Sequence, residues 1–118
     1  SLLEGLYEPV ESREFRLKIL AEDFRAAGTA VLDSLAEYAK EQPGWSIAPD
    51  NCEGVRVNLD KAHGDGWFLL RLSLHDPILP LNIESDREHG ARTIARELAP
   101  FLAQQTEIDA SSALEFTL

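Results

Sequence analysis

Between Arg71 and Pro77 the sequence reads Arg-Leu-Ser-Leu-His-Asp-Pro, so a guanidinium, a hydroxyl and an imidazole fall close together. An arginine at a strand end can bridge two phosphate oxygens, while a serine hydroxyl and turn amides supply further donors. Arg71 and Ser73 are two residues apart, so their side chains share one face of an extended strand. Pro77 keeps the preceding residue out of helical geometry and favours a turn. The segment is either a small phosphate site or a solvated strand face without a role.

Four segments carry alternating apolar residues, the pattern of strands with one buried face. An Asp65-Gly66 pair between the second and third segments predicts a hairpin. Pro80 in the fourth segment donates no ladder hydrogen bond, which predicts an edge strand or a bulge. The predicted strands are Ser12–Ile19, Val55–Asp60, Trp67–Ser73 and Ile78–Glu84.

Two further segments carry apolar residues at spacings of three and four, which is typical of a helix with one buried stripe. Glycine and threonine at 28 and 29 weaken the early turns of the first, so it begins at Asp23 or at Thr29. The run Ser85–Glu88 has the form of a capping box that opens the second, and Pro100 is expected to kink or shorten its end. The predicted helices are Asp23–Lys40 and Asp86–Leu102.

The order β-α-β-β-β-α predicts an α+β domain in which two helices cover one face of a four-stranded antiparallel sheet. A chain of 118 residues fits a single domain, residues 1–118. From Thr106 the sequence is mostly polar, so residues 106–118 could fray or add a short strand.

The charge and the single cysteine restrict the partners and the compartment. A formal charge of −10, from 21 acidic and 11 basic residues, disfavours binding to nucleic acid or to an anionic membrane surface. A single phosphate remains compatible, because salt screens the diffuse field within roughly 10 Å and a few local donors can outweigh it. Cys52 is the only cysteine, and we expect it to be inert and the compartment to be the reducing cytoplasm.

Neither a metal site nor a membrane segment is expected. His63, His75 and His89 have no spacing that suggests a metal. No apolar run approaches the roughly 20 residues that span a bilayer, and the first residues do not form an export signal. The chain contains no methionine, so we expect it to be part of a longer protein.

The stretch from Gly66 to about Leu102 resembles the C-terminal domain of the α-D-phosphohexomutases, of the phosphomannomutase and phosphoglucomutase type. In that family an aspartate-glycine hairpin leads into a strand that ends Arg-x-Ser-Asn-Thr-Glu-Pro, followed by a strand reading roughly Leu-Arg-Leu-Asn-Val-Glu and a helix. More loosely, Tyr7 to Asp23 resembles the family's entry into this domain. The residues that match in order and spacing are Asp65-Gly66, Arg71, Ser73, Pro77, Leu81-Asn82 and Glu84.

The resemblance implies a TBP-like fold and a part in an isomerase that acts as an intramolecular phosphotransferase in carbohydrate metabolism. The loop would hold the phosphate of a hexose phosphate that is not transferred. The phosphoserine, a magnesium site and the residues that select the sugar would come from the preceding domains of the same enzyme. This fragment would hold no catalytic residue and no cofactor, and it would be inactive alone.

Four positions depart from the family pattern. Leu74, His75 and Asp76 replace a small polar residue, a threonine and a glutamate, and Pro80 stands where the family has its second arginine. Leu74 and His75 still offer backbone amides to a phosphate, and a protonated imidazole can partly replace a hydroxyl. The resemblance therefore gives Arg71, Ser73, Leu74 and His75 as the phosphate-binding residues.

Two other readings remain open. The first is a binding or interaction module of the same fold whose phosphate loop has degenerated, which Leu74, His75 and Pro80 would explain directly. The second is an unrelated small α+β domain that packs against a partner, in which case the loop match is accidental.

Overall fold

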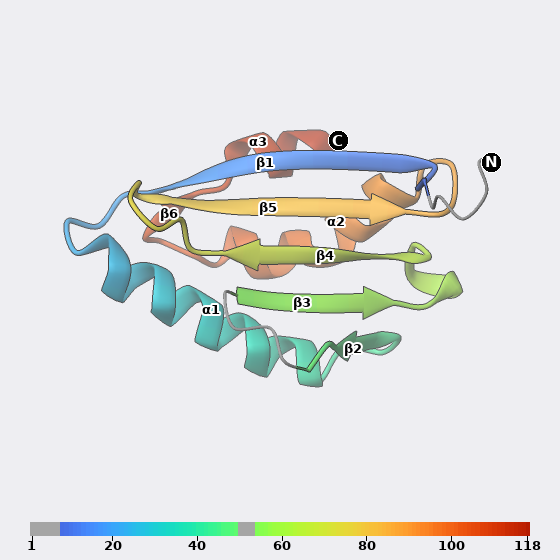
Figure 1. Cartoon of the computed structure of the whole chain (residues 1–118), viewed down its shortest axis with the longest axis horizontal. Coiled ribbons are helices and arrows are strands. Elements are labelled where there is room, and N and C mark those ends of the chain that lie inside the picture. Colours follow the sequence, from blue (N-terminus) through green and yellow to red (C-terminus); the bar gives the residue numbers. More distant parts are fainter. Residues whose placement is uncertain (1–7, 50–53) are drawn as a thin grey trace.

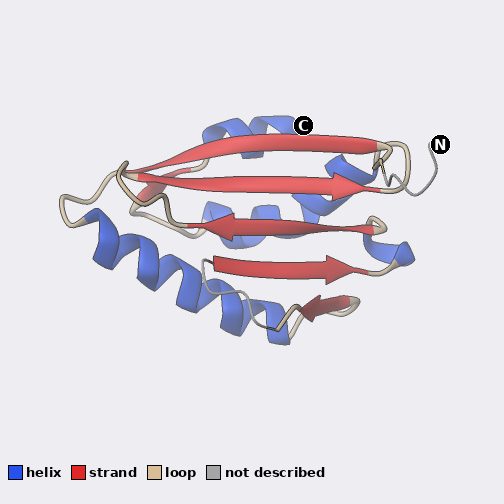
Figure 2. Cartoon of the chain, in the orientation of Figure 1, coloured by secondary structure: helices blue, strands red, loops and turns tan. Residues whose placement is uncertain are grey.

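The computed structural model describes residues 8–49 and 54–118, so Tyr7 and Cys52 lie outside the described residues. The described chain forms an antiparallel sheet with helices against it (Figure 1; Figure 2). The strands are β1 Glu11–Ile19, β2 Trp45–Ile47, β3 Gly54–Leu59, β4 Gly66–Arg71, β5 Ile78–Ser85 and β6 Ile108–Asp109, in the order β2-β3-β4-β5-β1-β6. The helices are α1 Phe24–Lys40, α2 Gly90–Ala103, α3 Ser111–Phe116 and a short 3-10 helix, η1 Lys61–His63.

The α+β class with an antiparallel sheet is confirmed, but the predicted count of four strands and two α-helices is wrong. Within the described residues the sheet has six strands, and a third α-helix follows β6. The additional strands are three and two residues long, which is too short to show an alternating pattern. Residues 108–116, for which the sequence left fraying or a short strand open, contain both β6 and α3.

One face of the sheet is buried and the other is open. Leu17 lies opposite Leu79, and Phe68 lies opposite Ile83, in pairs that are fully buried. The buried residues of α1 and α2 belong to the same hydrophobic cluster as these strand residues, so both helices pack on one face. In Figure 1 the strands lie in front of α2, which leaves the opposite face of the sheet uncovered.

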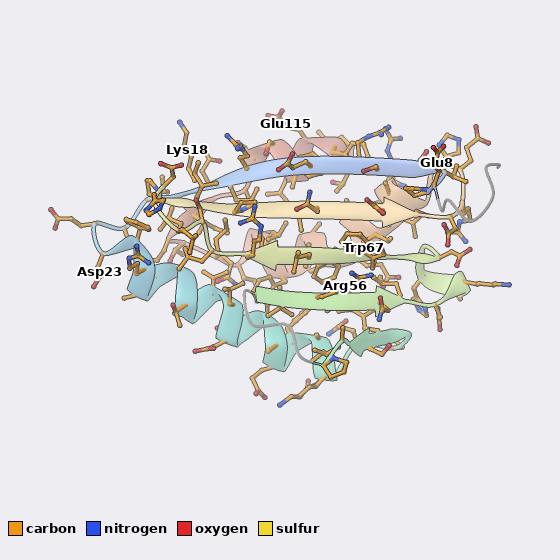
Figure 3. The ribbon with its side chains drawn as sticks, viewed as in Figure 1. Glu8, Lys18, Asp23, Arg56, Trp67 and Glu115 are labelled. Atoms are coloured by element: carbon orange, nitrogen blue, oxygen red, sulfur yellow. The ribbon has the colours of Figure 1, made fainter. Side chains whose placement is uncertain are left out.

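The open face carries polar and charged side chains together with Trp67. The guanidinium of Arg56 on β3 lies 4.1 Å from the centre of the Trp67 ring on β4, and Figure 3 shows the two on neighbouring strands. Such a contact between a cation and an aromatic face is favourable at an exposed site.

Pro80 lies in a central strand, because β5 is flanked by β4 and β1, so the predicted edge position is wrong. On the β1 side the pairing includes Arg16 opposite Pro80. On the β4 side the register ends at Leu70 opposite Leu81, one position before the proline. Since proline has no amide hydrogen, it supplies no donor for the next ladder bond. The ladder between the two strands is therefore interrupted at Arg71, and a hydrogen bond from the Ser73 amide to the Ile78 carbonyl joins them again at the base of the turn.

Helix α2 begins later than predicted, at Gly90, and the capping box is wrong. The Ser85 hydroxyl donates to the Gly64 carbonyl at 2.5 Å and accepts from the Arg87 amide at 3.1 Å. A Cβ on Gly90 would lie 1.8 Å from the Ser85 hydroxyl oxygen, so this glycine allows the close approach. Ser85 is buried and ties the hairpin to the start of the helix instead of capping it.

The α2 amides find their acceptor on β1. One carboxylate oxygen of Glu11 accepts from the His89 amide at 2.9 Å, and the other accepts from the Ala91 amide at 3.0 Å. These hydrogen bonds, the one from His89 first, hold the pKa of Glu11 below its ordinary value. Glu11 therefore caps α2 from a distant part of the sequence.

Helix α1 begins at Phe24, which resolves the ambiguous start. The Asp23 carboxylate accepts from the Ala26 amide at 3.2 Å and acts as the N-cap. A Cβ on Gly28 would lie 2.7 Å from a methyl carbon of Leu72, so the glycine lets α1 approach the end of β4 closely. This contact places the beginning of α1 beside the turn between β4 and β5.

Candidate anion-binding site

The turn between β4 and β5 lies at the rim of the sheet and is held at its base by backbone hydrogen bonds. The Ser73 amide donates to the Ile78 carbonyl at 3.0 Å, and the Ile78 amide donates to the Asp76 carbonyl at 2.7 Å. On the β1 side, the Ile19 amide donates to the Pro77 carbonyl at 2.8 Å. The base of the turn is thus fixed to two strands while its tip faces solvent.

Three consecutive amides at the tip are unpaired. Within the described part of the chain, the amides of Leu74, His75 and Asp76 donate to no protein acceptor. All three residues are exposed. Unpaired backbone donors that follow one another in a turn form a concavity suited to an anion. The amides of Leu74 and His75 are the backbone donors that the family resemblance implies.

Arg25 at the start of α1 fixes the orientation of this turn. Its Nη2 atom donates to the Leu74 carbonyl at 2.6 Å. The peptide bond between Leu74 and His75 is trans and planar, so its carbonyl and amide point in opposite directions. Because the carbonyl points toward α1, the His75 amide points away from α1. Sequence reasoning missed Arg25, since nothing local links it to a turn 49 residues later.

Arg71 and Ser73 come to the same rim from the open face. Phe68 and Leu70 of β4 are fully buried on the helical side, and Leu72 continues that side by packing near Gly28. Arg71 and Ser73 alternate with these residues and lie on the open side. The structure therefore brings all four sequence-predicted site residues to one end of the sheet: Arg71, Ser73, Leu74 and His75. The Leu74 side chain is 70% exposed and contributes no donor.

A separate hollow of about 490 Å³ lies between α1, η1 and α2 at the opposite end of β4. His63 lines it and contacts the Asp60 carboxylate through Nδ1 at 2.6 Å. This hydrogen bond raises the pKa of His63 and lowers that of Asp60. Glu97, also on the wall, accepts from the Trp45 indole nitrogen at 2.8 Å. The hydrogen bond between Trp45 and Glu97 links β2 to α2, whereas the contact between His63 and Asp60 stays within the segment around η1.

The described residues hold neither a candidate metal site nor a helix that could span a membrane. They contain no group of three or more histidine, cysteine or acidic residues that could hold a metal ion. None of their helices is both long enough and apolar enough to cross a membrane.

Fold and site together define an α+β domain with an exposed turn, held at its base by backbone hydrogen bonds, at the rim of its sheet. A comparison of the sequence with models of protein families and with curated proteins gave no match. Any assignment of function therefore depends on the residues of the turn and their geometry.

Proposed function

We propose that this chain is the C-terminal, phosphate-binding domain of a phosphohexomutase of the phosphomannomutase and phosphoglucomutase type. One observation carries the proposal: three consecutive unpaired amides lie beside Arg71 and Ser73, in the segment that resembles the family's phosphate loop. The β-α-β-β-β-α order, which is contained in the six-stranded sheet, supports the TBP-like fold of such domains.

The domain would hold the phosphate of a hexose phosphate that is not being transferred. Arg71 can bind two phosphate oxygens through its planar guanidinium, and Ser73 can donate its hydroxyl from the same side. The amides of Leu74, His75 and Asp76 supply donors that cost no side-chain reorganisation. Phosphoryl transfer depends mainly on positioning and on charge stabilisation, so a fixed phosphate anchor contributes directly to the rate.

The remaining parts of the enzyme would come from preceding domains of a longer, cytoplasmic protein. These domains would supply the phosphoserine and the magnesium ion, and the residues that select the hexose. The present chain would then have no mutase activity of its own, and its partners would be the hexose phosphate and those preceding domains.

The proposal is tested by titrating the ¹⁵N-labelled chain with glucose 6-phosphate, and with glucose as the uncharged control. We expect shifts centred on the amides of Ser73 to Asp76, for the phosphate ester only. Binding should be weak and salt-sensitive, because one charged hydrogen-bonding partner contributes about 1.5–3 kcal/mol. It should disappear in Arg71→Ala. An undisturbed turn at millimolar glucose 6-phosphate would contradict the proposal.

The second candidate is a module of the same fold that no longer binds phosphate. The exposed Leu74 side chain favours it, since a large apolar group at the tip offers nothing to an anion. Pro80 favours it too, since it removes an arginine that the family pattern contains. The same titration separates the two candidates, because this module predicts no response to either ligand.

A further inference from the structure

The open face beside the turn carries two more cations, on β1. In the pairing of β1 with β5, Arg16 lies opposite Pro80 and Lys18 lies opposite Ile78. Across β5, the hydrogen bond from Ser73 to Ile78 places Ser73 beside Ile78, and Arg71 lies two residues earlier, beside Pro80. The six side chains that neighbour one another in this way alternate along their strands with residues of the helical side, so they share the open face.

These residues define a surface that we call the cradle. Its floor is formed by β5, and its two walls are formed by side chains from β1 and from the end of β4. Ile78 and Pro80 form the floor. Directly opposite residues on neighbouring strands have Cβ atoms about 4.5–5.5 Å apart, so arginines on both sides of Pro80 can reach one group above it. Pro80 is buried although no helix covers this face, which is expected if the flanking side chains lie across it.

Among the described residues, Arg16 has no competing partner. No described residue forms a salt bridge or hydrogen bond with the guanidinium of Arg16 or of Arg71. Lys18 is different, because Asp109 on β6 lies opposite it and offsets part of its charge. Figure 3 shows Lys18 at the same end of the sheet as Asp23, where α1 begins.

Four cations gather at this end of the sheet in a chain whose net charge is −10, together with the carboxylates of Asp76 and Asp109. Arg16, Lys18, Arg25 and Arg71 account for four of the 11 basic residues and all lie at this end of the sheet. A local group of cations of this kind attracts an anion at short range. Salt screens the repulsion from acidic residues that lie more than roughly 10 Å away.

We infer that Arg16, assisted by Lys18, forms a second wall of the phosphate site, so that a dianionic phosphate monoester lies on the open face between β1 and β4. This inference rests on the proposed function and extends it to a residue outside the loop. Arg16 supplies from the neighbouring strand a guanidinium that Pro80 cannot supply. The ester approaches across Ile78 and Pro80, on the side of the sheet that the helices leave free.

The test measures the dissociation constant of glucose 6-phosphate by ¹⁵N titration for the unaltered chain and for Arg16→Gln, Arg71→Gln and Lys61→Gln. Lys61 is the matched control, because it is exposed on η1 at the opposite end of β4 and its loss changes the net charge equally. Loss of a charged hydrogen-bonding partner should weaken binding about tenfold or more in Arg16→Gln and Arg71→Gln. The control should change it less than about twofold at 0.15 M salt.

Three results would refute the inference that Arg16 forms a second wall of the phosphate site. If Arg71→Gln weakens binding but Arg16→Gln behaves like the Lys61 control, the second wall is refuted while the proposed function stands. If the unaltered chain does not bind the ester, both are refuted. If an acidic peptide shifts the amides around Arg16 and glucose 6-phosphate does not, the cradle is a protein-docking surface and the phosphate assignment is wrong. Amide spectra that superimpose away from the cradle show that each variant remains folded.

Discussion

At the scale of single residues, the candidate site depends on backbone groups as much as on side chains. Leu74 and His75 differ from the family pattern, yet their amides remain unpaired at the tip of the turn. A phosphate bound by amides tolerates changes of side chain, provided that the backbone keeps its conformation. Arg25 is the described residue whose side chain holds this backbone, through the Leu74 carbonyl.

We therefore expect Arg25→Ala to free the turn and to weaken binding of glucose 6-phosphate about two- to tenfold, since a typical hydrogen bond contributes about 0.5–1.5 kcal/mol. Heteronuclear relaxation should show greater motion of the His75 amide. Arg25→Lys keeps the charge and separates anchoring from electrostatic attraction. Unchanged relaxation and affinity in Arg25→Ala would show that the anchor is unnecessary.

The pair formed by His63 and Asp60 makes stability depend on pH. The pKa of His63 is higher in the folded than in the unfolded chain. The stability that this contributes is complete below the unfolded-state pKa of about 6.5 and is lost as the pH rises through the folded-state pKa. The lowered pKa of Asp60 contributes stability that is present above its unfolded value of about 3.9 and is lost as the pH falls through the folded value.

The pair should therefore stabilise the fold most between about pH 4 and pH 6.5. Urea unfolding of the unaltered chain and of Asp60→Asn at pH 5.5 and at pH 9 measures this. We expect the difference in unfolding free energy to be larger at pH 5.5. An equal difference at both values would mean that the contact does not involve a charged histidine.

At the scale of elements, Glu11 links β1 to the start of α2. Glu11→Ala should lower the free energy of unfolding by about 0.5–2 kcal/mol at pH 7, the usual effect of losing an N-cap. The pKa of Glu11 is lowered, so its contribution is present above the unfolded value and is lost as the pH falls through the folded value. Urea unfolding at pH 7 and below pH 4 should show the effect shrinking in acid, and an effect independent of pH would contradict the cap.

The buried face of α2 gives a second prediction at this scale. Leu98 is fully buried against the sheet, so Leu98→Ala removes apolar burial and leaves a cavity. We expect a loss of about 2–5 kcal/mol in unfolding free energy. Chemical denaturation measures it, and an unchanged midpoint would show that α2 does not pack on the sheet through this residue.

The elements that could be predicted from the sequence are those long enough to show a period. The alternation of Phe15, Leu17 and Ile19 predicts β1, and the apolar stripe of residues at spacings of three and four predicts α1. The start of α2 could not be predicted, because its amides pair with Glu11, which lies 80 residues earlier than Ala91. Similarly, the two-residue β6 exists only because β1 offers it a partner.

The same limit applies to the candidate site. Arg71 and Ser73 follow from a period of two and from Pro77, all within one segment. Arg25 and Arg16 reach the turn from α1 and β1, so only the packed structure brings them there. Local sequence thus predicts the loop, whereas tertiary packing determines what surrounds it.

At the scale of the whole molecule, the domain is asymmetric in both packing and charge. The described helices cover one face of the sheet, and the cations of the cradle lie on the other face at the end where α1 begins. Under the proposed function, a domain of this form would present a phosphate to whatever faces its open side. In the proposed enzyme, that side would face the preceding domains, which carry out the transfer.

The most direct test is a crystal structure of the chain with glucose 6-phosphate, grown without sulfate or phosphate. The account predicts a phosphate at the rim, with oxygens about 2.7–3.2 Å from the amides of His75 or Asp76 and from the Arg71 guanidinium. It also predicts that the sugar lies on the open side of the sheet. A turn that stays empty at saturating ligand, or a phosphate bound elsewhere on the molecule, would contradict the account.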